Sequence, residues 1–242
     1  MPTSAVTTIF LDDGGVMNDN TLRGPEWQRL VGEYLSPRLG GSLQAWGDAN
    51  QVIATREFKL YKDHNWGTGE LDFLAFREQS DRDWLLGMTE MLGVEAPEGD
   101  ACLRLAREAY GFVTRRVRSA FPGAVDAIRQ LHVTGYPLYI ASGEDSDHLD
   151  GYLEGMGVRD LFRTLYGPDI VNTAKEVPEY HSRILDHAGV EPGEAVVVDD
   201  SPQVVAWARD TGAMGVLVSA EGEGAGPVIP NLAALPAFLA SL

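Results

Sequence analysis

The feature that most constrains the fold is an alternation of short apolar runs with helix-length segments in the second half of the chain. Four apolar runs predict strands, at 137–141, 162–166, 195–198 and 214–218. The segments between them predict helices, at 147–156, 178–188 and 203–211. A further apolar run at 6–11 predicts a strand near the N-terminus. Strands that alternate with helices are joined by crossover connections, so we expect a doubly wound α/β domain with a parallel sheet.

The stretch from residue 19 to residue 118 differs, because it contains no convincing strand. Its apolar residues recur at helical spacing, and breaks such as Pro37 and Pro97 separate the segments, at 26–35, 43–61, 70–76, 84–92 and 101–117. We therefore predict a core of residues 1–18 and 119–242, with a helical domain of residues 19–118 inserted after the first strand. Near the C-terminus we expect a surface loop at 221–226 and a short helix at 229–239.

The charge balance limits the partners of this chain. Its formal net charge is −17, so it repels nucleic acid and acidic membrane surfaces. No stretch approaches the roughly 20 apolar residues of a membrane span, and the N-terminus lacks the pattern of a signal peptide. The single cysteine, Cys102, cannot form an internal disulfide. We expect a cytoplasmic protein that binds neither nucleic acid nor a membrane, and the sequence carries no signal for its oligomeric state.

Polar residues gather where the predicted strands end. Four segments contribute them: Asp12-Asp13 after the first strand, Ser142-Gly143 after the second, Asp199-Asp200 after the run at 195–198, and Lys175 before the helix that leads into that run. In an open parallel sheet, ligands bind beyond the carboxyl ends of the strands. We therefore expect carboxylates, a hydroxyl and an ammonium to meet at one edge of the sheet.

A metal ion is the simplest explanation for carboxylates gathered in this way. Neighbouring carboxylates repel each other unless they are protonated or bridged by a cation, and Mg²⁺ takes oxygen ligands of this kind. With a metal present, a free carboxylate can attack a phosphoryl group while Ser and Lys hold its other oxygens. The alternatives are an Asp-Gly turn at 13–14 and helix capping by Ser142 or by one residue of the pair at 199–200.

These motifs resemble those of the haloacid dehalogenase-like (HAD) superfamily of hydrolases. "DDGGVM" is similar to the first motif of that family, "YIASGE" to the second, "AKEVPEYH" to the third and "VVVDDSPQ" to the fourth, in the family's order. The helical insertion stands where the family has a helical cap. The resemblance implies a Rossmann-like core, Mg²⁺ as cofactor and a small phosphorylated or other anionic metabolite as substrate.

The resemblance also implies roles for individual residues. Asp12 would attack phosphorus and become an aspartyl-phosphate, while Ser142, Gly143 and Lys175 would bind the transferred phosphoryl group. The implied metal ligands are the Asp12 carboxylate, the backbone carbonyl of Gly14, Asp199 and Asp200.

Two basic residues of the insertion are candidates for substrate binding. Arg56 and Lys59 share one helical face, from which they are expected to meet an anionic substrate. The alternative is that this face is simply solvated.

Position 14 departs from the family pattern. In the family's phosphatases an Asp there protonates the leaving oxygen and then activates water, which Gly14 cannot do. General acid–base help is typically worth about 10²–10⁴-fold in rate. Asp13 is expected to point to the opposite side of the strand, so it is a poor replacement. We therefore predict a Mg²⁺-dependent phosphatase that is slow unless another group substitutes.

Two other functions stay open. Family branches that cleave carbon–phosphorus or carbon–halogen bonds also lack the second Asp, although Asp199-Asp200 argues for a retained metal and against the metal-free dehalogenases. The other alternative is a catalytically impaired module that binds phosphorylated ligands. Mg²⁺-dependent turnover of simple phosphate esters would distinguish the phosphatase from such a module.

Overall fold

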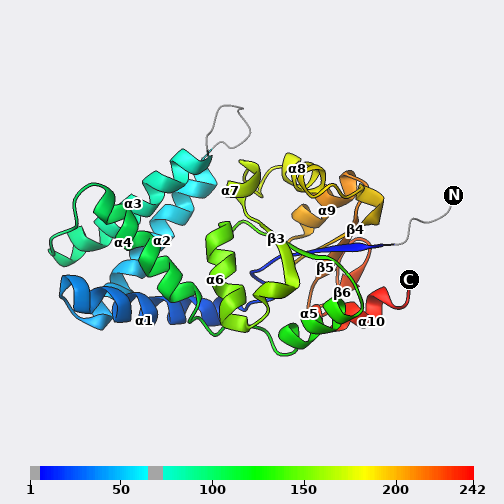
Figure 1. Ribbon diagram of the computed structural model, residues 1–242, viewed down its shortest axis with the longest axis horizontal. Helices are drawn as coiled ribbons and strands as arrows, with labels where there is room; N and C mark the ends of the chain where they lie inside the picture. The colour runs from blue at the N-terminus through cyan, green and yellow to red at the C-terminus, as the bar shows by residue number, and fades with distance from the viewer. Residues whose placement is uncertain (1–5, 65–72) are drawn as a thin grey trace. The chain divides into compact units, whose positions relative to one another are not determined.

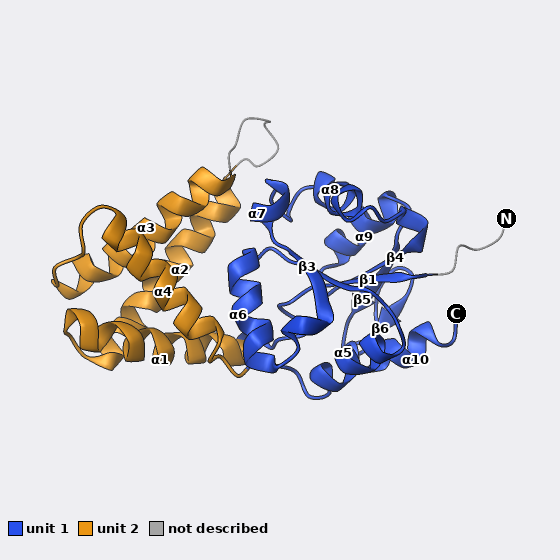
Figure 2. Ribbon diagram, in the orientation of Figure 1, with its two compact units in different colours: residues 1–20, 119–242 blue, residues 21–118 orange. Residues whose placement is uncertain are grey.

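The structure is a computed structural model that describes residues 6–64 and 73–242 (Figure 1). The chain divides into one unit of residues 1–20 and 119–242, and a second unit of residues 21–118 (Figure 2). Along the described part of the chain, every helix is too short or too polar to cross a membrane.

A six-stranded sheet forms the centre of the first unit. Its strand order is β3-β2-β1-β4-β5-β6, and every pairing is parallel. The strands are β1 (Thr8–Leu11), β2 (Leu138–Ala141), β3 (Phe162–Tyr166), β4 (Ala195–Asp199), β5 (Met214–Val218) and β6 (Val228–Ile229). Leu11 of β1 is in register with Ile140 of β2 and Val198 of β4. The carboxyl ends of these three neighbouring strands therefore meet at one edge.

Helices cover both faces of this sheet. They are α5 (Ala124–Val133), α6 (Ser146–Met156), α7 (Pro168–Val171), α8 (Glu179–Ala188), α9 (Pro202–Asp210) and α10 (Leu235–Leu239). Alternate residues of β1 face opposite ways: Ile9 and Leu11 pack with α5, α6 and α10, whereas Phe10 packs with α8 and α9. This alternation follows from the two-residue period of a strand. The predicted doubly wound parallel sheet is confirmed.

The end of the chain corrects one expectation. A helix was expected over residues 229–239, but Val228–Ile229 forms the edge strand β6, and the helix is confined to Leu235–Leu239. Backbone hydrogen bonds decide this, because Leu217 N donates to Pro227 O at 3.0 Å and Ser219 N donates to Ile229 O at 2.9 Å. The short apolar pair completes the sheet edge instead of starting a helix.

The second unit is helical. It contains α1 (Asn20–Leu39, whose first residue belongs to the first unit), α2 (Leu43–Asp63), α3 (Phe73–Leu92) and α4 (Asp100–Thr114). Helix α1 runs through Pro37, which was expected to end it. Helix α3 is continuous where two helices were expected, because its polar middle contains no Gly or Pro to interrupt it. Residues 70–72 of the first of those two lie outside the described residues.

Both chain segments that lead between the units are held together on the first unit. Asp19 N donates to Ser119 O at 2.7 Å, and Phe121 N donates to Met17 O at 2.9 Å. The Ser119 hydroxyl donates to Asn18 Oδ1 at 3.0 Å. The outgoing and returning segments are thus paired, which fixes the position of the loop after β1.

We predict that Gly32→Ala destabilises the protein, because α1 approaches the start of α2 closely at this glycine. A Cβ at position 32 would lie 2.3 Å from the backbone carbonyl oxygen of Leu43. Overpacking of this kind typically costs about 1–3 kcal/mol. Thermal unfolding followed by circular dichroism measures the effect as a lower Tm.

Gly111→Ala in α4 is the matched control. A Cβ there would meet only Arg115 Nη1, at 2.8 Å, the end of a flexible side chain. Alanine is favoured over glycine within a helix by about 1 kcal/mol, so we expect an unchanged or higher Tm. A Gly32→Ala protein as stable as this control would contradict the close approach of the two helices.

Candidate active site

Lys175 lies between two carboxylates at the centre of the candidate site. Its Nζ atom is 2.7 Å from Asp12 Oδ1 and 2.7 Å from Asp199 Oδ2. All three side chains are buried. Asp12 follows β1 and Asp199 ends the neighbouring β4, while Lys175 comes from the segment between α7 and α8. The structure therefore brings together three of the residues that the motifs singled out.

Burial and charge set the protonation of this group. Burial raises the pKa of Asp12 to about 7, against the lowering effect of Lys175, and the Asp199 charge adds to the increase. Burial alone would lower the pKa of Lys175, but the charges of Asp12 and Asp199 and hydrogen bonds to both raise it above its ordinary value. Lys175 is therefore a cation at neutral pH. Further positive charge near Asp12 would lower the pKa of the Asp12 carboxyl group and so favour its carboxylate form.

Three carboxylates fit a hard divalent cation. Single oxygen atoms of Asp12, Asp199 and Asp200 all lie within 4.8 Å of one another, and carboxylate oxygens are ligands that Mg²⁺ prefers. Three ionised carboxylates and one ammonium carry a net charge of −2, which a divalent ion would neutralise. Both the donor type and the charge of the site fit Mg²⁺, whereas a role for the Gly14 carbonyl stays a prediction.

Gly15 makes room for one of these carboxylates. It has a φ of +81°, and a Cβ there would lie 1.9 Å from Asp200 Oδ2. Asp200 therefore packs directly on the backbone of the loop after β1. Only glycine satisfies both the backbone angle and the close approach.

The capping alternative for the pair at 199–200 is wrong. Helix α9 has Ser201 as its N-cap, and the Ser201 Oγ accepts from Val204 N at 3.4 Å. Asp199 instead accepts from Ser201 N at 2.8 Å through Oδ1, while its Oδ2 faces Lys175. The pair is therefore available for the site.

Ser142 and Gly143 follow β2 at the same edge of the sheet. Ser142 is buried, and its Oγ accepts from Glu144 N at 3.3 Å. The N-cap of α6 is Asp145, so Ser142 does not cap that helix. A Cβ at Gly143 would lie 3.9 Å from Lys175 Cβ. These two positions and Lys175 are neighbours, as the motifs predict.

Tyr180 and His181 are buried beside the site, and sequence analysis assigned neither a role. The Tyr180 hydroxyl lies 3.0 Å from Ser142 O and 2.6 Å from Tyr166 O, which anchors the end of β2. Burial and the charge of Lys175 lower the pKa of His181 to about 4. His181 is therefore a neutral ring at pH 7. Both residues lie within the motif "AKEVPEYH", which was the only sequence signal for a position near the site. This signal is weak, because tyrosine and histidine also occur in helix cores.

The loop after β1 is held by Asp13. This side chain is fully buried, and its Oδ1 accepts from Asn18 Nδ2 at 2.7 Å. Its backbone carbonyl accepts from both Met17 N and Asn18 N at 2.9 Å. Asp13 therefore holds the loop in place, which agrees with the expectation that it is a poor replacement acid.

Asn20 lies over Gly14. A Cβ at position 14 would be 2.9 Å from Asn20 Oδ1 and 3.0 Å from Asn20 Nδ2. The carboxamide therefore occupies the space in which a side chain at position 14 would begin. Sequence analysis missed Asn20, because an asparagine six residues further along carries no motif signal.

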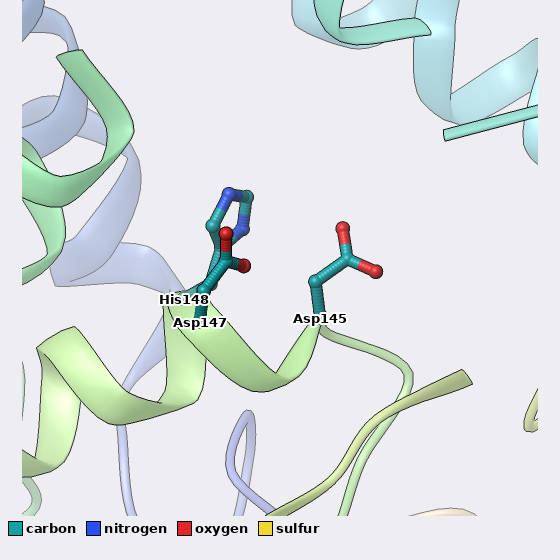
Figure 3. Close-up of side chains that lie close together, drawn as sticks. All are labelled: Asp145, Asp147 and His148. Carbon is teal, nitrogen blue, oxygen red and sulfur yellow. The ribbon is translucent and has the colours of Figure 1, made fainter. Parts of the chain in front are cut away.

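A second group of potential metal ligands lies at the start of α6. Figure 3 shows Asp145, Asp147 and His148, whose ligand atoms lie within 4.8 Å of one another. Burial alone would lower the pKa of His148, but the Glu144 carboxylate, 3.1 Å from Nδ1, and the charges of Asp145 and Asp147 raise it to about 9. The contact that the structure shows here is the ion pair of His148 with Glu144.

The predicted substrate contacts Arg56 and Lys59 lie on α2, in the second unit. Arg56 Nη2 is 3.1 Å from Glu57 Oε1, and Lys59 forms an ion pair with Asp63. Both side chains are exposed and have acidic neighbours on their own helix. Their contact with substrate stays a prediction.

Comparison with known proteins gives the family. The model of a family described as haloacid dehalogenase-like hydrolase matches residues 7–211. Phosphoglycolate phosphatase of Rhodospirillum rubrum is 32% identical over 120 residues, which are 50% of this chain and 49% of that protein. Phosphoglycolate phosphatase 1 of Pseudomonas aeruginosa is 28% identical over 128 residues, 53% of this chain and 47% of that protein. The chain thus matches about half the length of these curated relatives.

Solved structures agree on the fold. A defluorinating L-2-haloacid dehalogenase has a TM-score of 0.68 at 16% identity, covering 99% of this chain and 98% of that one. A HAD phosphatase from Thermococcus onnurineus has a TM-score of 0.58 at 20% identity, covering 97% of this chain and 98% of that one. These likenesses support the fold, and the family match spans most of the chain. Together with the acidic edge around Lys175, they confirm the resemblance: the chain belongs to the haloacid dehalogenase-like hydrolases.

Proposed function

We propose that this protein is a phosphatase that hydrolyses a small phosphorylated metabolite through an aspartyl-phosphate on Asp12. The observation that carries the proposal is the Lys175 ammonium, 2.7 Å from both Asp12 and Asp199 in a buried site. The phosphatase names of the curated relatives support a phosphate monoester as substrate.

The reaction has two steps. An oxygen of Asp12 attacks phosphorus, the bond between phosphorus and the leaving oxygen breaks, and that oxygen takes the bonding electrons. Water then attacks the aspartyl-phosphate, which releases inorganic phosphate and restores the Asp12 carboxylate. Lys175 holds the Asp12 carboxylate in place and offsets the negative charge of the phosphoryl oxygens.

The remaining residues bind and orient. Ser142, whose carbonyl accepts from the Tyr180 hydroxyl, and Gly143 would hold phosphoryl oxygens beside Lys175. Asp12, Asp199 and Asp200 would hold Mg²⁺, which would supply positive charge against the phosphoryl group.

Asn20 determines which leaving groups the site accepts. A carboxamide donates and accepts hydrogen bonds, but it does not transfer a proton at neutral pH. Next to Gly14, the Asn20 carboxamide can orient the leaving oxygen or a water molecule, but it cannot give the leaving oxygen a proton. We therefore expect good turnover only of esters whose leaving group departs as a stable anion.

Asp12→Asn tests the nucleophile. An amide cannot form the aspartyl-phosphate, so we expect Mg²⁺-dependent release of phosphate from p-nitrophenyl phosphate to fall by about 10³-fold or more. Asp63→Asn, an exposed Asp on α2, is the matched control and should keep full activity. Undiminished activity of Asp12→Asn would refute the proposed mechanism.

Gly15→Ala tests the metal site. The new Cβ would displace the Asp200 carboxylate, so we expect the Mg²⁺ concentration for half-maximal activity to rise by about 10-fold or more. Gly40→Ala is the control, because Gly40 has a similar φ of +83° but no atom within 4 Å of a Cβ. Equal Mg²⁺ dependence of the two variants would argue against Asp200 as a ligand.

Asn20→Asp tests the leaving-group assignment. It places a carboxyl group beside Gly14, so turnover of an alkyl phosphate such as glycerol phosphate should rise by about 10-fold or more. Turnover of p-nitrophenyl phosphate should change little, because its leaving group needs no proton. The measurement is kcat for both esters.

Two further variants complete this test. Asn20→Ala removes the carboxamide and should give no gain on the alkyl ester. Gly14→Asp should gain more activity in the Asn20→Ala background than alone, because the carboxamide then no longer crowds the new side chain. An equal gain in both backgrounds would contradict the steric role of Asn20.

A further inference from the structure

The two units differ sharply in charge. Residues 21–118 contain 13 Lys and Arg against 15 Asp and Glu, a net charge of −2. The rest of the chain holds the other 6 basic and 21 acidic residues, a net charge of −15. Most of the basic side chains of this acidic protein therefore belong to the helical unit.

A groove in the helical unit collects several of them. It has a volume of about 600 Å³ and is lined by Tyr34 of α1 and by residues of α4 and its C-terminal end. Four of the lining residues are arginines: Arg104, Arg107, Arg115 and Arg116. The volume lies within the range of small-molecule sites, about 300–1,000 Å³.

Aromatic rings of the groove stack with one lining arginine, Arg116, and with Arg38 at its border through Tyr34. The Arg116 guanidinium stacks on Phe112, with Cζ 3.8 Å from the ring centroid, and Arg38 stacks on Tyr34 at 3.7 Å. The two rings are themselves 5.0 Å apart. A stacked guanidinium keeps N–H groups at its edge for an anion and loses less freedom on binding than a solvated one.

The positive charge of the groove is only partly compensated. Elsewhere in this unit, Arg29 pairs with Glu26 and Glu33, and Arg82 with Glu78 and Asp100. In the groove, Arg107 donates to the buried Asp81 at 2.9 Å. Within residues 6–64 and 73–242, Arg104 and Arg116 have no carboxylate partner in an ion pair.

The one acidic side chain of the groove is engaged by a hydroxyl. Glu108 stands one turn after Arg104, where an ion pair would be expected on a solvated helix face. Instead its Oε2 accepts from the Tyr34 hydroxyl at 3.1 Å. The groove therefore offers guanidinium donors that the unit's own carboxylates do not satisfy.

We propose that this groove binds an oligophosphate, a small anion with two or more linked phosphate groups. Arginine forks match phosphate oxygens geometrically, and several guanidiniums along one groove favour a ligand with several charges over a monoester. The site is independent of the acidic edge around Lys175 and of the chemistry proposed there. Its ligand is either inorganic or the phosphate chain of a nucleotide.

Isothermal titration calorimetry of the full chain in EDTA tests the site, with tripolyphosphate and ATP as probes. Arg104→Ala/Arg116→Ala should weaken binding of both by about 10-fold or more, while the control Arg29→Ala/Arg82→Ala, which removes two ion-paired arginines, should leave it within 2-fold or so. Affinity should fall as salt rises. If tripolyphosphate and ATP bind with equal affinity, the groove recognises the phosphate groups alone. If ATP binds more tightly, the groove also contacts the nucleoside.

A gain-of-affinity variant keeps the test independent of folding defects. Glu108→Gln removes the one negative charge of the groove, so it should tighten tripolyphosphate binding several-fold. Binding that is unchanged by both Arg104→Ala/Arg116→Ala and Glu108→Gln, or undetectable in the intact chain, would overturn the proposal. Hexaglutamate bound as tightly as tripolyphosphate, with the same loss in the arginine variant, would replace the oligophosphate by an acidic peptide.

Discussion

The buried ammonium of Lys175 is the interaction on which the rest of the site depends. It bridges Asp12 and Asp199, which end neighbouring strands, so it stabilises two carboxylates that would otherwise repel each other. Removing one partner of a buried ion pair typically costs about 3–5 kcal/mol, because a charge is left uncompensated. The parallel register of β1 and β4 makes this bridge possible, and Asp200 completes the cluster because Gly15 leaves it room.

An acid at position 14 would offer both a backbone carbonyl as a predicted metal ligand and a carboxyl group for proton transfer. Glycine at this position in the loop after β1 offers only the backbone carbonyl. At Gly14 the space in which a side chain would begin is taken by the Asn20 carboxamide, while the backbone carbonyl stays a predicted metal ligand. This arrangement depends on Asp13, whose buried side chain and backbone carbonyl both bind Asn18 and so fold the loop back over itself. Among the described residues of the first unit, the place next to Gly14 holds a carboxamide and not a carboxyl group, which is the basis of the proposed dependence of the rate on the leaving group.

Charge is distributed unevenly, and this affects what each unit can bind. The sheet-containing unit carries nearly all of the net negative charge, so an anionic ligand is repelled there except near Lys175, where a bound cation would further reverse the local field. The helical unit is almost neutral, and four of its arginines line one groove along α4 and its C-terminal end, where Arg116 stacks on Phe112. The same chain thus offers anions two environments that rest on different chemistry: a buried ammonium in one unit and stacked guanidiniums in the other.

The sequence by itself determined the parallel sheet and the residues that meet at its edge. Apolar runs alternating with helices leave few topologies, and polar residues that follow or end neighbouring parallel strands must lie side by side, as Asp12 and Asp199 do. Lys175 comes from the segment between α7 and α8, and its motif alone placed it at the same edge. It did not determine β6, whose two residues become a strand only by pairing with β5, nor the continuity of α3. The contact of Asn20 with Gly14, the anchoring of Ser142 by Tyr180 and the arginine groove were also decided by tertiary structure. They depend on loop closure and on side chains from separate helices, and local periodicity carries no information about either.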